Sequence, residues 1–245
     1  MMNVLCTALD TTKVKLRVES IQGFVLHAKD YRDTSQLVDI FCEEFGRVRL
    51  VAKGSRSHKK NSYRLSPFNL ATLSWTGRSE LKTLTSYESN KTLSLSGESL
   101  ICGFYINELL WHLLQPEDSH PQLYQEYKNT LFALNTTSDI EPLLRHFELN
   151  LLNEAGYGVS FEYDSEGEFI EAEGHYLFTQ QVGWQRVSAT IKGALEGRSI
   201  LEIETRGFSD QATRRVCKQI TRAAIDELLE GKKLHSRELI SQLKS

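Results

Sequence analysis

Cysteine is scarce in this chain of 245 residues, and the four cysteines are widely separated, at Cys6, Cys42, Cys102 and Cys217. No two of them have the short spacing of a zinc-binding pair, and none stands beside a histidine in a zinc pattern. Isolated thiols are typical of small core residues in a reducing compartment. The sequence therefore predicts no metal site.

Long apolar runs are also absent. No segment approaches the roughly 20 apolar residues that a membrane-spanning helix needs, and the first 20 residues are too charged for a signal peptide. Hydrophobic residues make up 40% and charged residues 25% of the chain, which is the balance of a globular protein. We therefore expect a soluble, cytoplasmic protein without a membrane partner.

The motifs of common enzyme classes are missing as well. The chain has no P-loop, no GxSxG nucleophile turn, no HExxH zinc motif and no Cys/His dyad. Its seven histidines are dispersed, and Gly156-Tyr157-Gly158 indicates a helix stop rather than a dinucleotide-binding loop. The residues therefore show no motif of these enzyme or cofactor-binding classes.

Acidic residues are absent from Phe45 to Ser79, although the whole chain has a net charge of -3. We call this segment the basic window, and its eight cations are Arg47, Arg49, Lys53, Arg56, Lys59, Lys60, Arg64 and Arg78. A surface that serves only solubility mixes both signs of charge. The window therefore predicts an anion-binding surface, and a long anion of this kind is usually nucleic acid. The alternative is a solvated surface loop.

The first third of the chain is rich in short β-branched and aromatic segments that are separated by turn signals. Strands are predicted over residues 21–28, 36–41, 47–52, 69–75 and 80–85. Five short strands in about 70 residues suit a small closed barrel, for which the OB-fold is the commonest candidate.

Charged and apolar residues alternate within the third predicted strand. If Val48 and Leu50 face the core, Arg47 and Arg49 share the outer face. Residues 55–66 then form a long polar loop, and loops of this length are commonly functional. Three aromatic residues are candidates for stacking on bases, with the barrel core as the alternative for the last two: Tyr63, Phe68 and Trp75.

From about residue 94 onward, apolar residues recur at helical spacing. Helices are expected near residues 100–114, 123–134, 140–155, 210–229 and 236–243. The run from Ser138 to Glu141 predicts a capping box at the start of the third helix, and Gly156 predicts its end. The stretch that follows, from 159 to 183, is acidic and predicted to be irregular.

These elements predict an α+β protein. We expect an N-terminal extension over residues 1–20, a five-stranded OB-fold barrel over 21–93 and a mostly helical domain over 94–245. The helical domain would carry an irregular acidic insertion over residues 159–185.

A second group of cations lies on the helix predicted over residues 210–229. Arg214, Lys218 and Arg222 follow each other at four-residue spacing and share one face, with Arg215 beside them. This face is either a second nucleic-acid patch or the ordinary charged outside of an amphipathic helix, and the residues alone leave both open.

Two further features are weak when read alone. Arg145 with Leu149 one turn later could take an acidic, hydrophobic peptide tail, but a helix with one snorkelling arginine has the same pattern. Eight acids without any lysine or arginine lie between His146 and Gln185. Their spacing matches no EF-hand or two-metal pattern, which favours a solvated loop over divalent-metal catalysis.

Ordered blocks of sequence resemble the RecO family of bacterial recombination mediators. The blocks run from Gly23-Phe24-Val25-Leu26-His27 through Gly46-Arg47-Val48-Arg49-Leu50-Val51-Ala52-Lys53-Gly54 and Arg145-His146-Phe147-Glu148-Leu149 to Gly231-Lys232-Lys233-Leu234. The similarity covers nearly everything from Gln22 to Leu239.

The resemblance implies an OB-fold, a helical C-terminal domain and a function without catalysis. Family members bind single- and double-stranded DNA, anneal complementary strands and work with RecR to load RecA onto single strands coated by SSB. In the family, the OB face and C-terminal basic residues contact DNA. The DNA-binding candidates here are Arg47, Arg49, Lys53, Arg56, Lys59, Lys60, Arg64, Arg78, Lys82, Arg214, Arg215, Lys218 and Arg222.

The SSB tail is acidic and ends in an apolar residue, and in some members it docks at positions that match Arg145 and Leu149. Many members also carry a four-cysteine zinc site in the segment that matches 162–185, where this chain has no cysteine, so the resemblance predicts no zinc. A DNA-binding member would be associated with the nucleoid. Two alternatives stay open: a metal-dependent nuclease, and an OB-fold module that binds proteins only.

Overall fold

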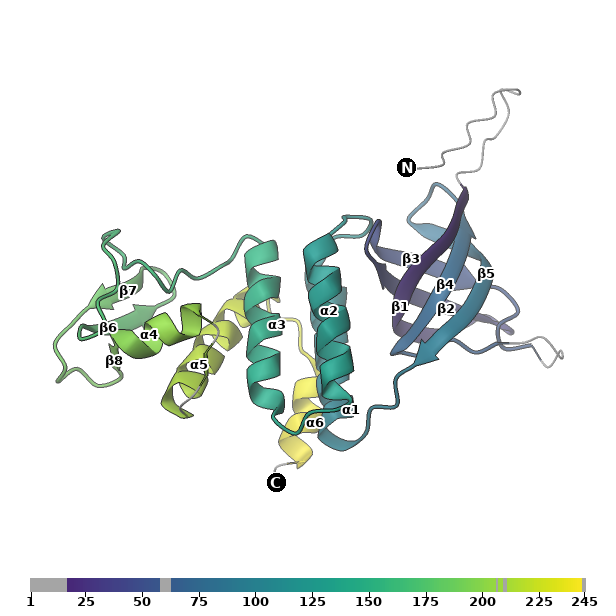
Figure 1. The fold of residues 1–245 in the computed structure, drawn as a ribbon. Coiled ribbons are helices and arrows are strands. Elements are labelled where there is room, and N and C mark those ends of the chain that lie inside the picture. Colours follow the sequence, from purple (N-terminus) through teal and green to yellow (C-terminus); the bar gives the residue numbers. More distant parts are fainter. Residues whose placement is uncertain (1–16, 58–62, 206, 209–210, 244–245) are drawn as a thin grey trace. The chain divides into compact units, whose positions relative to one another are not determined.

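The computed structural model describes residues 17–57, 63–205, 207–208 and 211–243 (Figure 1). The chain divides into two compact units, and each is described by itself. Within the described part, the first unit holds residues 17–42 and 47–92. The second unit holds Glu43–Gly46 and the chain from Leu93 onward.

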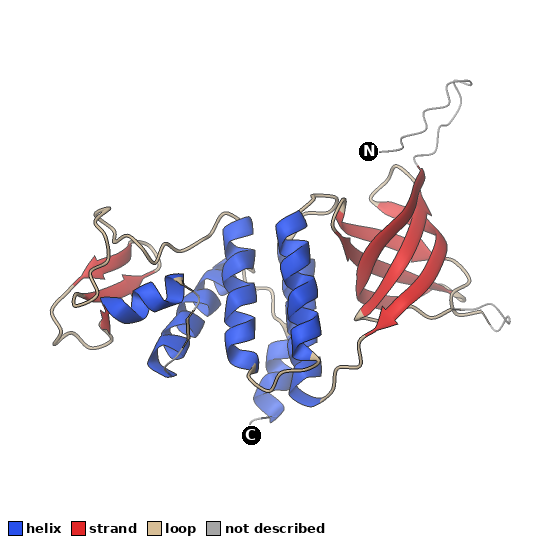
Figure 2. Ribbon diagram, in the orientation of Figure 1, coloured by secondary structure: helices blue, strands red, loops and turns tan. Residues whose placement is uncertain are grey.

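The first unit is a closed barrel of five strands (Figure 2). They are β1 (Arg17–Tyr31), β2 (Ser35–Cys42), β3 (Gly46–Ala52), β4 (Asn69–Thr76) and β5 (Leu81–Thr92). Their order around the barrel is β1-β2-β3-β5-β4, and β3 runs parallel to β5 while β4 is antiparallel to both β1 and β5. This arrangement confirms the predicted five-stranded OB-fold.

Two strands are longer than predicted. β1 begins at Arg17, which pairs with Thr76, and β5 runs on to Thr92, which pairs with Asn69. The added ends are largely exposed and polar, so they lack the apolar alternation that marks a strand in sequence. The hydrogen-bonded ladder to β4 forms these ends instead, because a strand needs a paired backbone more than a buried face.

The barrel interior is filled by large apolar side chains. Phe24, Leu50 and Leu73 are fully buried, and Phe68 and Trp75 are 4% and 1% exposed. The structure therefore assigns Phe68 and Trp75 to the barrel core, and their interpretation as base-stacking residues is wrong.

The second unit contains six helices in the part of the chain that is described. They are α1 (Gly97–Leu113), α2 (Pro121–Leu134), α3 (Ile140–Glu154), α4 (Gly197–Glu204), α5 (Gln211–Leu228) and α6 (His235–Leu243). α3 packs against both α2 and α5, and α6 packs against α1 (Figure 1). Over the described ranges, none of the helices has the length and apolar character needed to cross a membrane.

The capping prediction for α3 is only half right. Gly156 has a φ of +79° and follows the last turn, as predicted for a helix stop. At the other end the N-cap residue is Asp139, and its side chain makes no capping hydrogen bond. The Asp139 carboxylate instead accepts two hydrogen bonds from the Arg214 guanidinium on α5, at 3.2 and 3.3 Å. A stronger charged partner from another helix displaces the local cap.

The acidic stretch is more ordered than predicted. It contains β6 (His175–Thr179) and leads into β7 (Gly183–Arg186), and these two strands join β8 (Leu195–Glu196) in a small sheet. α4 follows this sheet and was not predicted. Strands of four or five residues and a two-turn helix are too short to show a clear hydrophobic period.

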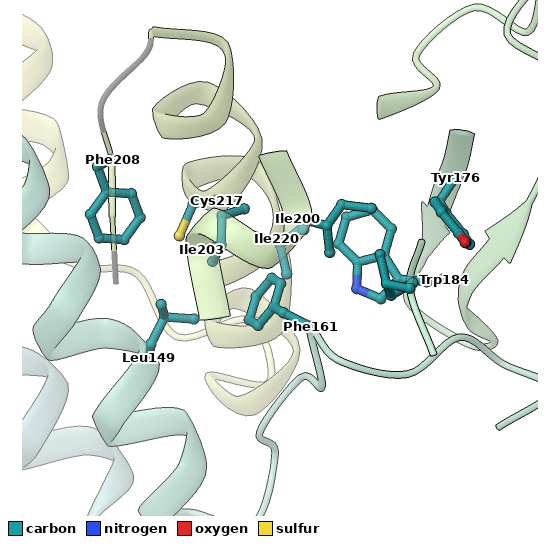
Figure 3. Close-up of a cluster of buried hydrophobic side chains, with 10 residues drawn as sticks. Leu149, Phe161, Tyr176, Trp184, Ile200, Ile203, Phe208, Cys217 and Ile220 are labelled. Carbon is teal, nitrogen blue, oxygen red and sulfur yellow. The ribbon is translucent and has the colours of Figure 1, made fainter. Parts of the chain in front are cut away.

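A hydrophobic cluster holds this small sheet to α3, α4 and α5 (Figure 3). Its buried members include Leu149 of α3, Ile200 of α4, Cys217 of α5 and Trp184 of β7. The Trp184 indole Nε1 also donates to the Ser160 carbonyl at 3.0 Å, so this buried polar atom is satisfied. Apolar packing therefore holds together the acidic segment, in which the sequence predicts no zinc site.

We predict that Trp184→Ala lowers the free energy of unfolding by about 3–5 kcal/mol, because it removes a large, fully buried side chain of this cluster. The measurement is urea denaturation followed by circular dichroism. Val182→Ala is the matched control, since Val182 is the residue before β7 and is 52% exposed. It should change stability by at most about 0.5 kcal/mol, and equal losses in both variants would contradict the role of the cluster.

Candidate nucleic-acid interface

Arg47 and Arg49 of β3 are held by one buried carboxylate. The Asp39 Oδ1 atom lies 3.4 Å from the Arg47 Nη1 and 2.9 Å from the Arg49 Nε. The two arginines therefore do share a face, as the alternation predicts. However, the Arg47 side chain is only 10% exposed, whereas that of Arg49 is 38% exposed. Burial lowers the pKa of the Arg47 guanidinium from its ordinary value, and the attraction of Asp39 opposes this effect.

The prediction that Arg47 lies on an open DNA-binding face is therefore wrong. The Arg47 guanidinium is largely buried and Asp39 compensates its charge, whereas the Arg49 side chain reaches solvent. β2 supplies Asp39, which lies eight residues before Arg47 and outside the basic window. A count of charges within the window could not include it.

Arg56 and Arg64 share a second aspartate. The carboxylate of Asp30, at the end of β1, lies 3.2 Å from the Arg56 Nη2 and 3.2 Å from the Arg64 Nη2. This aspartate is 48% exposed and the Arg64 side chain 69% exposed, so solvent screens the pairs. Arg56 and Arg64 are thus tied to β1, and these two arginines with Asp30 keep one uncompensated positive charge.

The other DNA-binding candidates of the barrel, which include Lys82 just after the window, differ in their exposure and contacts. Lys53 and Arg78 are exposed, and neither is in an ion pair with another residue of the described part. Lys82 is 4% exposed and its Nζ donates to the Ser79 carbonyl at 3.1 Å, so its predicted place on the surface is wrong. Lys59 and Lys60 lie outside the described residues. Of the DNA-binding candidates that the structure describes on the barrel, Lys53, Arg64 and Arg78 are exposed and Arg49 and Arg56 are partly exposed, and we call these five the exposed positive surface of the barrel.

One aromatic contact on the barrel is absent from the predictions. Tyr63 stacks on Tyr87 of β5, with ring centroids 5.0 Å apart and an angle of 17° between the rings. Both residues are partly exposed. Tyr87 gave no signal in sequence because it stands eight residues after the basic window, on an extension of β5 that was not predicted.

The cations of α5 have partners on α3. Arg214 binds Asp139 and also donates from Nε to the Phe208 carbonyl at 2.7 Å, and Lys218 lies 3.4 Å from the Glu141 carboxylate. These contacts join the start of α3 to α5. Arg222 is 62% exposed with Asp226 at 3.9 Å, and Arg215 is exposed, so only this pair presents charge that is weakly compensated.

Arg145 belongs to a buried network that connects three helices. Its Nη2 lies 2.7 Å from the Glu148 Oε1 and its Nη1 donates to the Thr221 Oγ1 at 3.1 Å. Glu148 also accepts from the Tyr105 hydroxyl at 2.8 Å and from the Thr221 hydroxyl at 2.5 Å. Burial and the Glu148 charge raise the pKa of the Tyr105 hydroxyl above its ordinary value, so it stays a donor. Glu148 and Thr221 therefore hold the Arg145 side chain in place.

Arg145 and Leu149 do not lie in one groove. Arg145 lines a cleft of about 570 Å³ that is bordered by α1, α3, α5 and α6, together with Ile140 and Leu144. Leu149 is 3% exposed, lies within the cluster of Figure 3 and lines a different cleft of about 260 Å³. The predicted arrangement of an arginine beside exposed Leu149 is therefore wrong, and Ile140 and Leu144 are the apolar neighbours of Arg145 in its cleft.

The acidic stretch uses several of its carboxylates within the fold. The Asp164 Oδ1 accepts from the backbone N–H groups of Glu166 and Glu168, at 2.9 and 3.0 Å, and Glu171 pairs with Arg186 at 2.5 Å. Over the residues that the structure describes, no three His, Cys, Asp or Glu side chains gather as metal ligands would. The geometry thus offers no support for two-metal chemistry in this stretch.

Comparisons with known proteins agree on one family. The family model described as Recombination protein O N terminal matches residues 16–93, and that described as Recombination protein O C terminal matches residues 94–238. The chain is 42% identical to the DNA repair protein RecO of Pasteurella multocida over 228 residues, which is 90% of this chain and 94% of the relative.

Other relatives match over similar lengths. The DNA repair protein RecO of Haemophilus influenzae strain 86-028NP is 42% identical over 93% of this chain and 98% of its own length. The protein of the same name from Psychromonas ingrahamii is 39% identical over 92% of this chain and 99% of its own length. Two adjoining family models and relatives of full length lead to one conclusion: the chain belongs to the RecO family of DNA repair proteins.

Proposed function

We propose that this chain is a recombination mediator that binds single- and double-stranded DNA and anneals complementary strands. With RecR, it would help to load RecA onto single-stranded DNA coated by SSB. Membership of the RecO family gives it a role in DNA repair. We also propose that it works without catalysing covalent chemistry, in the cytoplasm and on the nucleoid.

The observation that carries the DNA-binding part is the exposed positive surface of the barrel. Lys53 and Arg78 are exposed cations without an ion pair in the described part, and Arg49 and Arg64 reach solvent from shared aspartates. Cations of this kind bind phosphates, and phosphate contacts give affinity with little base readout. With about four phosphates neutralised, the logarithmic salt slope on single-stranded DNA should be near -3.

The cleft beside Arg145 supports the part of the proposal that concerns SSB. An acidic tail with an apolar end needs a guanidinium for its carboxylate and apolar side chains for its end. Arg145 lines the cleft but is 5% exposed and paired with Glu148, so it offers only the part of its charge that Glu148 leaves uncompensated, and Ile140 and Leu144 offer the apolar side chains. Arg214 and Lys218 contribute less free charge because Asp139 and Glu141 hold them.

Two alternatives lead to different experiments. A metal-dependent nuclease would degrade labelled DNA in the presence of Mg²⁺ or Mn²⁺, whereas we expect the DNA to stay intact. A module that binds proteins only would not retard single-stranded DNA at any salt concentration, whereas we expect a shift that weakens as salt rises.

We predict that Lys53→Glu combined with Arg78→Glu raises the Kd for single-stranded DNA about tenfold or more, because each change removes a phosphate contact. The salt slope should fall in magnitude by about 1.4, and fluorescence anisotropy at several salt concentrations measures both quantities. Lys192→Glu with Arg198→Glu is the control, since it makes the same change in net charge at exposed residues of the second unit. Equal losses in both variants would argue against the barrel surface.

We predict different effects on DNA affinity and on stability for the two aspartates that bridge arginine pairs. Asp30→Asn should raise DNA affinity several-fold, because it frees Arg56 and Arg64, and should change stability by less than about 1 kcal/mol. Asp39→Asn should cost about 3 kcal/mol of stability, because it removes the carboxylate that lies beside the buried charge of Arg47. Anisotropy and urea denaturation measure the two effects, and similar stability losses would contradict the assigned difference in burial.

We predict that Arg145→Lys weakens binding of an acidic peptide with an apolar C-terminal residue about tenfold, because lysine lacks the guanidinium fork. Lysine keeps the charge opposite Glu148 but loses the hydrogen bond to Thr221, so the melting temperature should fall less than that of Arg145→Ala. Isothermal titration with the peptide measures the effect, and the same peptide without its apolar end is the control. A parallel loss of DNA affinity would show that the two ligands do not use separate surfaces.

A further inference from the structure

We infer that Tyr63 and Tyr87 together form a stacking platform for an unpaired nucleobase on the outside of the barrel. This inference rests on the proposed binding of single-stranded DNA and adds a base-contacting site to it. The exposed cations of the barrel recognise phosphates, which every strand presents alike. Two tyrosine rings would instead recognise the flat face of a base that is not stacked in a duplex.

The geometry of the pair suits this role. The two rings are nearly parallel, at 17°, with centroids 5.0 Å apart, so each covers one face of the other and a base would stack on an outer face of the pair. Both residues remain partly exposed, whereas Phe68 and Trp75 are enclosed in the core. A base can therefore reach the tyrosines without opening the barrel.

Tyr87 is held in place by a buried polar residue. Its hydroxyl donates to the Asn69 Oδ1 at 3.0 Å, and Asn69 is 4% exposed. The Asn69 Nδ2 in turn donates to the Ser89 Oγ at 2.8 Å and to the Thr92 Oγ1 at 2.6 Å. Asn69 therefore fixes the ring to the ladder between β4 and β5. A ring that is already ordered loses little conformational entropy when a base stacks on it.

The charge around the platform is compatible with a nucleic acid strand. Arg64 follows Tyr63 directly in the chain, its side chain is 69% exposed, and Asp30 holds its guanidinium. A phosphate at Arg64 would place the neighbouring base within reach of the tyrosines. Burial raises the pKa of both tyrosine hydroxyls above the ordinary value of 10.0, so neither ring carries a negative charge that would repel the strand.

The test compares two oligonucleotides that have the same number of phosphates. One is a single strand of thymidines, and the other is a strand of the same length in which every base is replaced by an abasic spacer. Fluorescence anisotropy of both with the full chain separates the contribution of bases from that of phosphates. Stacking of one base contributes about 1–3 kcal/mol, so the wild-type protein should bind the thymidine strand about fivefold to a hundredfold more tightly.

Tyr87→Leu should remove most of this preference and leave affinity for the abasic strand unchanged. Tyr87→Phe keeps the ring and should retain most of the preference. Tyr163→Leu is the matched control, because Tyr163 is also an exposed tyrosine in contact with an aromatic ring, the tilted ring of Phe169, but lies in the second unit. It should behave as the wild-type protein does.

Several results would overturn the inference. A wild-type protein that binds both strands equally does not use base stacking, and a Tyr87→Leu variant that loses affinity for both strands equally does not act through bases. Thermal melting shows whether Tyr87→Leu folds, and Tyr63→Leu replaces it if the change in β5 prevents folding. A wild-type protein that binds neither strand would refute the proposed DNA binding itself, which is a different outcome.

Discussion

The pairing of Asp39 with two arginines of β3 is the interaction on which the charged side of the barrel depends. Asp39 is buried, Arg47 is nearly so, and Arg49 reaches solvent from the same carboxylate. Without this compensation, two guanidinium groups two residues apart would repel each other, and the buried charge of Arg47 would lose its carboxylate. The aspartate thus allows positive charge to accumulate on a barrel wall while the wall stays folded.

The second unit follows the same rule with different residues. Glu148 compensates Arg145 in the interior, and Asp139 and Glu141 hold Arg214 and Lys218 at the surface. These contacts connect α3 to α5, so charges that suggested ligand binding also join helices. A binding partner can therefore use only the positive charge that these carboxylates leave uncompensated.

Regular elements with a clear hydrophobic period were predictable, and the exceptions have physical causes. The five strands and five of the helices were expected from periodicity and turn residues, whereas α4 and the sheet of β6, β7 and β8 were not. These short elements owe their order to the cluster around Trp184 and Leu149, whose members lie far apart in sequence. The capping prediction failed because the N-cap residue is Asp139 rather than Ser138, and Arg214, from another helix, binds the Asp139 carboxylate.

The sequence by itself determined the fold class, the family and the chemical nature of the surface, because composition, periodicity and ordered motifs are local properties of a chain. Only the tertiary structure decided which cations are free. The partners of Arg64 and Arg49 lie 34 and 10 residues away in the chain, and both lie outside the basic window. Tyr87 stacks on Tyr63 across a comparable separation, and Arg145 and Leu149, one turn apart, line different clefts. Acidic residues are absent from the basic window of the sequence, but in the fold Asp30 and Asp39 lie beside its arginines, because ion pairing and stacking act through space.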